Sequence, residues 1–172
     1  MESPVSAKYN PPMNLIADLR RIVLRDIDTL RREIELYPDD ESVWREVPGL
    51  PNPGGTLILH LTGNLRHYFG ALMGKSGYVR DRPAEFSTRG VPRHELLQRI
   101  AAAHAEVGET LAHLDPAVLD EIYPEPLRDH SLPTGLFFLQ LAVHLTYHLG
   151  QLDYHRRMVT GDSASAEALA PP

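Results

Sequence analysis

The amino-acid sequence predicts an all-α protein whose fold is a four-helix bundle with long connections. Three observations support this prediction. Four long segments carry apolar residues at helical spacing, no segment has the alternation and flanking turns of a strand, and 172 residues with 42% hydrophobic content suffice for one sizeable core. We therefore expect a single helical domain over residues 1–172, with an ordered core from about 13 to 159 and loose N- and C-terminal tails.

The first helix is expected from Met13 to about Tyr37, where the apolar residues form one buried stripe. The stretch that follows, YPDDESVWREVPGLPNPGG, is dense in proline and glycine and cannot continue a helix. We expect it to form an ordered connection that Trp44, the only tryptophan of the chain, anchors to the core.

The second helix is expected from Thr56 to about Met73, and the stretch GKSGYVRDRPAEFSTRGVP then breaks it with another long connection. The third helix is expected to begin near Pro92, because proline suits the first position of a helix, and to end before Asp115. A short helical turn is expected at 117–122.

The fourth helix is expected from about Pro133 to Val159, and it is apolar on nearly every side. The side opposite its histidines carries Phe138, Leu139, Ala142, Leu145 and Leu149. Something must cover this second face. Other helices of the bundle can do so, and a symmetric homodimer is the alternative that we expect.

Composition excludes several classes of protein. The formal charge of −6 comes from intermixed acids and bases, and no block of Lys or Arg is present to follow a nucleic-acid backbone or an anionic membrane. The chain has no cysteine, so a metal must be bound by His, Asp, Glu or backbone. No signal peptide and no apolar run of membrane-spanning length are evident, so we expect a cytoplasmic protein.

Polar side chains line up on one face of the fourth helix, which is otherwise apolar. The residues that share this stripe are Gln140, His144, His148, Gln151 and His155. The second helix repeats the pattern, and its polar stripe consists of His60, Asn64 and His67. Because polar groups that face an apolar interior need partners, we expect the two stripes to meet.

The pattern alone leaves two interpretations of these histidines open. His60 can join His144 and His148, which stand four apart, to place three imidazoles around one point, as in an open metal site. Each histidine can instead be satisfied by a buried hydrogen bond with no metal present, and chance also produces pairs at this spacing.

On the metal interpretation, the other members of the stripes have supporting roles. Asn64 and Gln151 are expected to hydrogen-bond the ligand imidazoles and to fix which nitrogen faces the metal. The residues expected to line the pocket are Gln140, His67 and His155. No side chain is assigned a catalytic role, and the zinc-protease pattern His-Glu-x-x-His is absent because Leu145 follows His144.

The stretch GGTLILHLTGNLRHYFG and, later in the chain, HLTYHLGQLDYHRRM resemble the DinB superfamily, which includes bacillithiol- and mycothiol-type S-transferases. The stretch YVRDRPAEF between them is similar to a segment common in one branch of that group. The resemblance covers roughly Met13 to Val159. It implies a four-helix bundle, frequently dimeric, that holds a divalent metal through three histidines, here His60, His144 and His148.

The function that this resemblance favours is a metal-dependent S-transferase that uses a low-molecular-weight thiol in detoxification or the stress response. Its nucleophile would be a metal-bound thiolate. Zinc is the first expectation for the metal and nickel the alternative. Two other functions stay open: a hydrolase of small substrates that uses metal-bound water, and a stress protein that binds a metal or small ligand without turnover.

Such thiols carry carboxylates, so a cationic pocket mouth would favour their binding. The arginines that can supply it are Arg80, Arg82 and Arg89 in the second connection, or Arg156 and Arg157 near the end of the fourth helix. Each of them can instead be an ordinary solvated charge, which is the commoner role of a single surface arginine.

Overall fold

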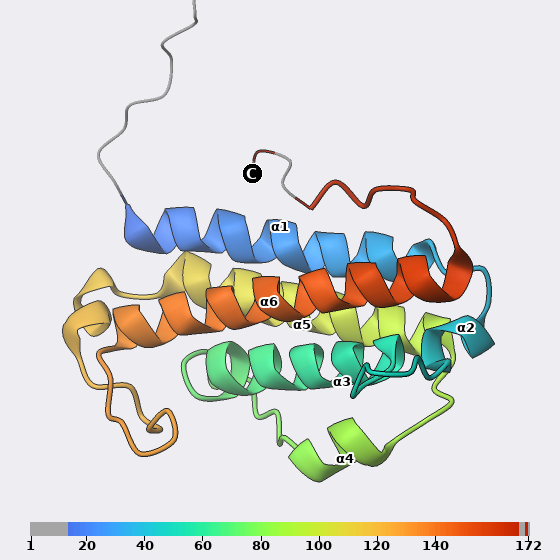
Figure 1. The fold of residues 1–172 in the computed structure, drawn as a ribbon. Coiled ribbons are helices and arrows are strands. Elements are labelled where there is room, and N and C mark those ends of the chain that lie inside the picture. Colours follow the sequence, from blue (N-terminus) through green and yellow to red (C-terminus); the bar gives the residue numbers. More distant parts are fainter. Residues whose placement is uncertain (1–13, 169–170, 172) are drawn as a thin grey trace, which may run out of the picture.

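The computed structural model describes residues 14–168 and residue 171, and it is an all-α bundle, as predicted (Figure 1). Its long helices are α1 (Leu15–Glu35), α3 (Gly54–Leu65), α5 (Arg93–His113) and α6 (Thr134–Thr160). Within the described residues there are no strands, only two isolated β-bridges. The predicted helix start at Met13 lies outside the described residues.

Four shorter elements complete the described chain, and three of them lie in the connections between the long helices. The 3₁₀ helix η2 (Pro116–Asp120) was expected as a short turn. Two helices within the connections were not predicted, namely α2 (Asp40–Trp44) and α4 (Arg82–Ser87). Side chains cap both of them, because Asp39 accepts from the backbone of Ser42 and Asp81 from that of Ala84. Prolines and glycines dominate the sequence of both connections and indicate loops, so the short capping signals of Asp39 and Asp81 were not recognised.

The order of the helices explains the long second connection. Helix α3 continues directly into a π-helical turn, η1 (Arg66–Ala71). Helices α3 and α5 run in the same direction, so residues 72–92 return along the bundle before α5 begins (Figure 1). On this return they form α4, which packs against α3 on the outside of the bundle.

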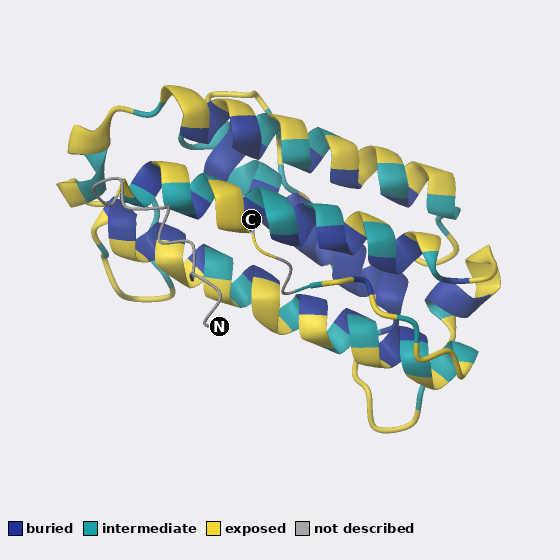
Figure 2. Ribbon diagram, turned by 90° about the horizontal axis from the view of Figure 1, so that it is seen from above, coloured by how far each residue is buried: buried dark blue, intermediate teal, exposed yellow. Residues whose placement is uncertain are grey.

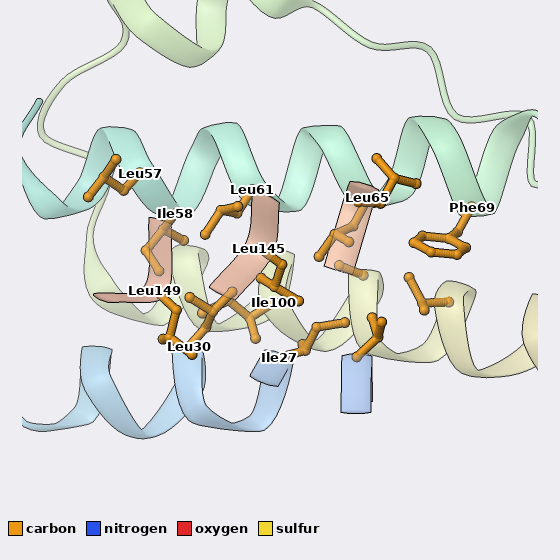
Figure 3. Close-up of a cluster of buried hydrophobic side chains, with 14 of the residues drawn as sticks. Ile27, Leu30, Leu57, Ile58, Leu61, Leu65, Phe69, Ile100, Leu145 and Leu149 are labelled. Atoms are coloured by element: carbon orange, nitrogen blue, oxygen red, sulfur yellow. The ribbon is translucent and has the colours of Figure 1, made fainter. Parts of the chain in front are cut away.

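The core lies between the four long helices. Helix α1 packs on α5 and α6, and α3 packs on the same two helices from the other side. The cluster drawn in Figure 3 joins α1, α3, α5 and α6 through Leu30, Leu61, Ile100 and Leu145. Burying each such side chain contributes about 1.5–3 kcal/mol.

Burial differs between the helices, as Figure 2 shows by colour. Helix α1 alternates between buried and exposed residues, whereas every residue of α3 is buried. Helix α3 is covered on the outside by the connection that carries α4. No helix in the described part of the chain combines the length and the apolar character that a membrane span requires.

Trp44 anchors the first connection, as expected. Its indole Nε1 donates to the carbonyl oxygen of Val91 at 2.9 Å. The ring lies directly on Gly55, where an added Cβ would stand 2.4 Å from a ring carbon. A glycine at the start of α3 therefore allows the tryptophan to pack against the helix backbone.

The C-terminal segment is attached along the bundle, which differs from the loose tail that its composition predicts. The buried Arg156 pairs with Glu33 on α1 at 2.5 Å and donates to the carbonyl oxygen of Ala164 at 2.6 Å. Arg32 donates to the carbonyl oxygen of Ala166, which is 4% exposed. The two bonds to Ala164 and Ala166 use backbone carbonyls, which every sequence offers, so side-chain composition gives no sign of them.

Candidate metal site

The two polar stripes meet where α3 and α6 cross. His60 lies on α3 and His144 and His148 lie on successive turns of α6. One ring nitrogen from each of the three histidines lies within 4.8 Å of the others. The Nε2 atoms of His60 and His144 are 3.2 Å apart. These three residues form a cluster that can hold a metal ion.

Burial keeps the imidazoles of α6 neutral at pH 7. Desolvation, followed by the proximity of His148 and His60, lowers the pKa of His144 to about 4. Desolvation also lowers the pKa of His148, against a hydrogen bond with Gln151 that acts in the opposite direction. Neutral imidazoles carry the free lone pairs that metal binding requires.

A carboxylate orients His60. The Nδ1 atom of His60 lies 3.0 Å from Oε2 of Glu85 on α4, so Nδ1–H donates and the lone pair stays on Nε2. Arg80 binds the same carboxylate through Nε at 2.6 Å and Nη2 at 2.9 Å. Although burial acts to raise the pKa of Glu85, hydrogen bonds from His60 and Arg80 bring it below its ordinary value.

Gln151 holds the ring of His148 in the same way. Its Oε1 lies 2.6 Å from Nδ1 of His148, so this nitrogen donates and Nε2 is left for the site. The Nδ1 atom of His144 is buried and has no hydrogen-bond partner among the described residues. Two of the three imidazoles are therefore held by an oxygen acceptor.

The histidines open into a cavity of about 490 Å³ between α3, α4, α6 and the 127–128 segment. Its apolar walls include Leu57, Phe137 and Leu141, and its polar lining includes Gln140. Asn64 also lines the cavity and makes no hydrogen bond to an imidazole. Its Oδ1 is buried and has no partner in the part of the chain that the structure describes, so it is an acceptor available to a ligand.

His67 is not among the residues that line this cavity, in contrast to the prediction. It belongs to η1, whose i to i+5 hydrogen bonds put more residues into each turn than an α-helix has. The wider turn brings Tyr68 to the cavity wall and leaves His67 facing Glu125, with 3.2 Å between His67 Nε2 and Glu125 Oε2.

His155 does not line the cavity either, although it shares the stripe of His144 and His148. It is fully buried at the level of the first connection. Its Nε2–H donates to the carbonyl oxygen of Arg45 at 2.8 Å, and its Nδ1 accepts from the hydroxyl of Tyr37 at 2.8 Å. Both ring nitrogens have a hydrogen-bond partner, so His155 serves the packing of the bundle and offers no free nitrogen to a metal.

The expected cationic mouth is only partly present. Arg80 and Arg82 line the cavity, and Arg128, which the sequence did not single out, joins them. The other expected arginines lie elsewhere: Arg89 donates to the carbonyl oxygens of Phe86 and Thr88, Arg156 is buried against Glu33, and Arg157 pairs with Asp153.

Sequence reasoning missed Glu85 as well as Arg128. Both stand in connections, where no helical period links a side chain to a face. The only available signal for Glu85 was its position inside the stretch YVRDRPAEF, which carried part of the family resemblance. Arg128 gave no signal in the sequence; in the structure its backbone has a positive φ of 56°.

The fold and the site together define a class: a four-helix-bundle protein with a three-histidine cluster suited to a divalent metal. The model of the DinB superfamily matches residues 23–152, so the chain belongs to that superfamily. This match confirms the resemblance predicted from the two histidine segments. The search of curated proteins finds no match for the chain.

Proposed function

We propose that this protein binds one divalent metal ion, zinc first and nickel as the alternative, through His60, His144 and His148. We further propose that it transfers a low-molecular-weight thiol to electrophilic small molecules. The observation that carries the proposal is the convergence of three ring nitrogens within 4.8 Å at the wall of a ligand-sized cavity. A metal ion bound there would supply a Lewis acid that lowers the pKa of a bound thiol.

The protein's own residues would bind and orient the two reactants. Leu57, Phe137 and Leu141 offer apolar surface to an electrophile, and the unpartnered Oδ1 of Asn64 accepts a hydrogen bond from either reactant. In the reaction the thiol loses its proton to solvent, its sulfur bonds to the electrophilic carbon, and the leaving group departs with the bonding electrons.

The charge of the cavity supports an anionic thiol. Three arginines line it, and no described lining residue is an Asp or Glu, although the chain as a whole carries −6. Glu85 neutralises Arg80, whereas Arg82 and Arg128 have no carboxylate partner among the described residues. Carboxylates on the thiol would pair with these two guanidinium groups.

The lining also favours transfer over hydrolysis. A hydrolase would use metal-bound water, whose pKa the metal lowers only to about 7, and the described cavity wall offers no carboxylate to help remove its proton. A thiol is more acidic than water and needs no such base once it is bound in the site.

The first test is elemental analysis of the untagged protein beside the double variant H144A/H148A. We expect about one zinc or nickel ion per chain in the parent and none in the variant. The matched control is H104A/H113A, which removes two partly exposed histidines of α5 and should keep the metal.

The second test measures thioether formation between mercaptosuccinate and 1-chloro-2,4-dinitrobenzene. Turnover should require the metal and be lost in H144A/H148A. The variant R82Q/R128Q should raise KM for mercaptosuccinate about tenfold and leave KM for neutral mercaptoethanol unchanged. A metal-loaded protein that is inert to both thiols contradicts the transferase proposal and leaves a binding protein.

We also propose that the protein is a homodimer formed through the outer face of α6. This face consists of large, exposed apolar side chains at helical spacing: Leu136, Val143, Tyr147, Tyr154 and Met158. It adjoins a groove of about 390 Å³ next to Leu50 and Pro51. Of the residues that the sequence prediction named for this face, Leu139 is 43% exposed, whereas Phe138, Leu145 and Leu149 are buried inside the bundle.

Light scattering after gel filtration tests the dimer. The parent should elute with twice the chain mass, and V143D should elute as a monomer because it sets two buried charges against each other. The control V79D changes an apolar residue that is 86% exposed on the second connection and should stay dimeric. A monomeric parent contradicts the proposal.

A further inference from the structure

Glu85 is a buried carboxylate that reaches the histidine cluster from outside the bundle. It lies on α4 and is 6% exposed. Its Oε2 lies 3.0 Å from Nδ1 of His60, on the side of the ring that faces away from His144. The contact therefore joins a residue of the second connection to one of the three proposed metal ligands.

Arg80 fixes the position of this carboxylate. Its guanidinium group binds both oxygens, with Nε 2.6 Å from Oε1 and Nη2 2.9 Å from Oε2. A two-point pair of this kind sets the plane of the carboxylate as well as its place. Glu85 consequently presents one oxygen to His60 in a single orientation.

Helix α3 is shaped to receive the carboxylate. Gly63 stands one turn after His60, and a Cβ added to it would lie 2.2 Å from Oε1 of Glu85 and 2.9 Å from its Cδ. Any other residue at this position would push Glu85 away from the helix. The absence of a side chain at Gly63 thus makes the space in which Glu85 reaches His60.

The contact determines which nitrogen of His60 carries the proton. A carboxylate can only accept, so Nδ1 holds the hydrogen and Nε2 keeps its lone pair toward His144 and His148. An ion pair that served stability alone would not need to touch the imidazole. The Arg66–Glu106 pair, at 2.6 Å, is such a case, since neither of its residues contacts the histidine cluster.

We propose that Glu85, held by Arg80 and admitted by Gly63, is the positioning residue that presents His60 Nε2 to a divalent metal ion and so sets the affinity of the site. This inference rests on the proposed metal site and adds a residue to it. It also gives the second connection a role in metal binding.

The test uses E85Q, which keeps the size of the side chain and removes its second acceptor. Because Arg80 can only donate, the amide oxygen turns to Arg80 and the amide nitrogen faces His60. His60 then carries its proton on Nε2, the nitrogen that the metal needs. ¹⁵N spectra of the metal-free proteins should show His60 with its proton on Nδ1 in the parent and on Nε2 in E85Q.

Zinc affinity is measured in parallel by competition with a chromogenic chelator. E85Q should bind zinc about 10- to 100-fold more weakly than the parent. The matched control E106Q alters the Arg66–Glu106 pair and should bind within about threefold of the parent, since it lies outside the cluster. G63A, which displaces the carboxylate without changing it, should weaken zinc binding in the same direction as E85Q.

The outcomes separate this inference from the proposed function. Unchanged affinity and an unchanged proton position in E85Q, in a parent that binds zinc, overturn the role of Glu85 and leave the metal site intact. A parent that binds zinc no better than H144A/H148A overturns the metal site itself and the affinity role with it.

Discussion

The polar stripe of α6 holds histidines in two environments, and the difference between them separates structure from function. At the C-terminal end both nitrogens of His155 are bonded, one to Tyr37 and one to Arg45. In the middle of the helix, His144 faces another imidazole, and its Nδ1 has no partner within the described residues. A buried histidine whose two nitrogens both have oxygen partners completes the core, whereas histidines whose ring nitrogens converge on one another are suited to an added ligand.

The C-terminal end of α6 and the histidine cluster also differ in the buried Arg–Glu pair that lies beside each of them. Arg156 and Glu33 join α6 to α1 and hold the C-terminal segment. Arg80 and Glu85 lie within the second connection and touch His60. The first pair holds elements of the bundle together, and the second contacts the histidine cluster. Substitutions in the first pair should therefore lower stability and spare metal binding, whereas substitutions in the second should weaken metal binding.

The largest effect is expected from E33A. It leaves the fully buried Arg156 without its main partner and should lower the free energy of unfolding by about 3–5 kcal/mol. Urea unfolding of the metal-free protein measures this loss, and zinc affinity should stay within about threefold of the parent. The control E35A removes a pair that is 46% exposed and should cost less than about 0.5 kcal/mol. A loss from E33A as small as that of E35A contradicts the comparison.

The next effect separates the histidines themselves. H155L strands the hydroxyl of Tyr37 and the carbonyl of Arg45 and should cost about 2–3 kcal/mol in the metal-free protein. H144L removes a ring with an unpartnered buried nitrogen and should leave the metal-free protein equally stable or more so. Unfolding curves without metal test both variants. With zinc present, H144L should lose the stabilisation that zinc gives the parent.

A pH series sharpens the same comparison. The pKa of His144 is lowered to about 4 in the folded protein, so the unfolded chain takes up the proton first as the pH falls. Stability from neutral His144 is fully present above about pH 6.5 and declines down to about pH 4. H144L should lack this loss, worth about 2 kcal/mol after screening by solvent. Parallel stability curves for the two metal-free proteins would refute the expectation.

The smallest effect is expected from Q151L. It removes the acceptor from Nδ1 of His148, leaves the ring in place, and should weaken zinc binding about tenfold. The free energy of unfolding without metal should change little, because the lost bond lies in the partly exposed pocket wall. Chelator competition measures the affinity, and a value equal to that of the parent would assign Gln151 no part in holding His148.

Helical periodicity explains how much could be predicted. Fold class and the meeting of the two stripes follow from the spacing of His60, His144 and His148, because spacing on a helix determines a face. The spacing does not determine which other segment of the chain contacts that face at each turn of the helix. The stripe therefore reaches His155 correctly, but α6 has there passed the cavity and meets the first connection.

The remaining differences have equally local causes. The π turn shifts the face of the helix after Asn64, so Tyr68 replaces His67 at the cavity. A pattern with a period of 3.6 residues cannot anticipate such a turn. Glu85 comes from a connection, where contact depends on the path of the chain, and that path depends on the direction in which α5 runs.

Because residues 72–92 run back along the bundle, the candidate site is built from two parts of the chain, the long helices and the second connection. The nitrogen donors lie on α3 and α6, within the packed bundle, while Arg80, Arg82 and Glu85 lie on a surface connection. Connections accept changes of sequence and length that packed helices do not. Evolution or protein engineering can therefore replace this segment and change which ligands the cavity selects, while the bundle retains its histidines.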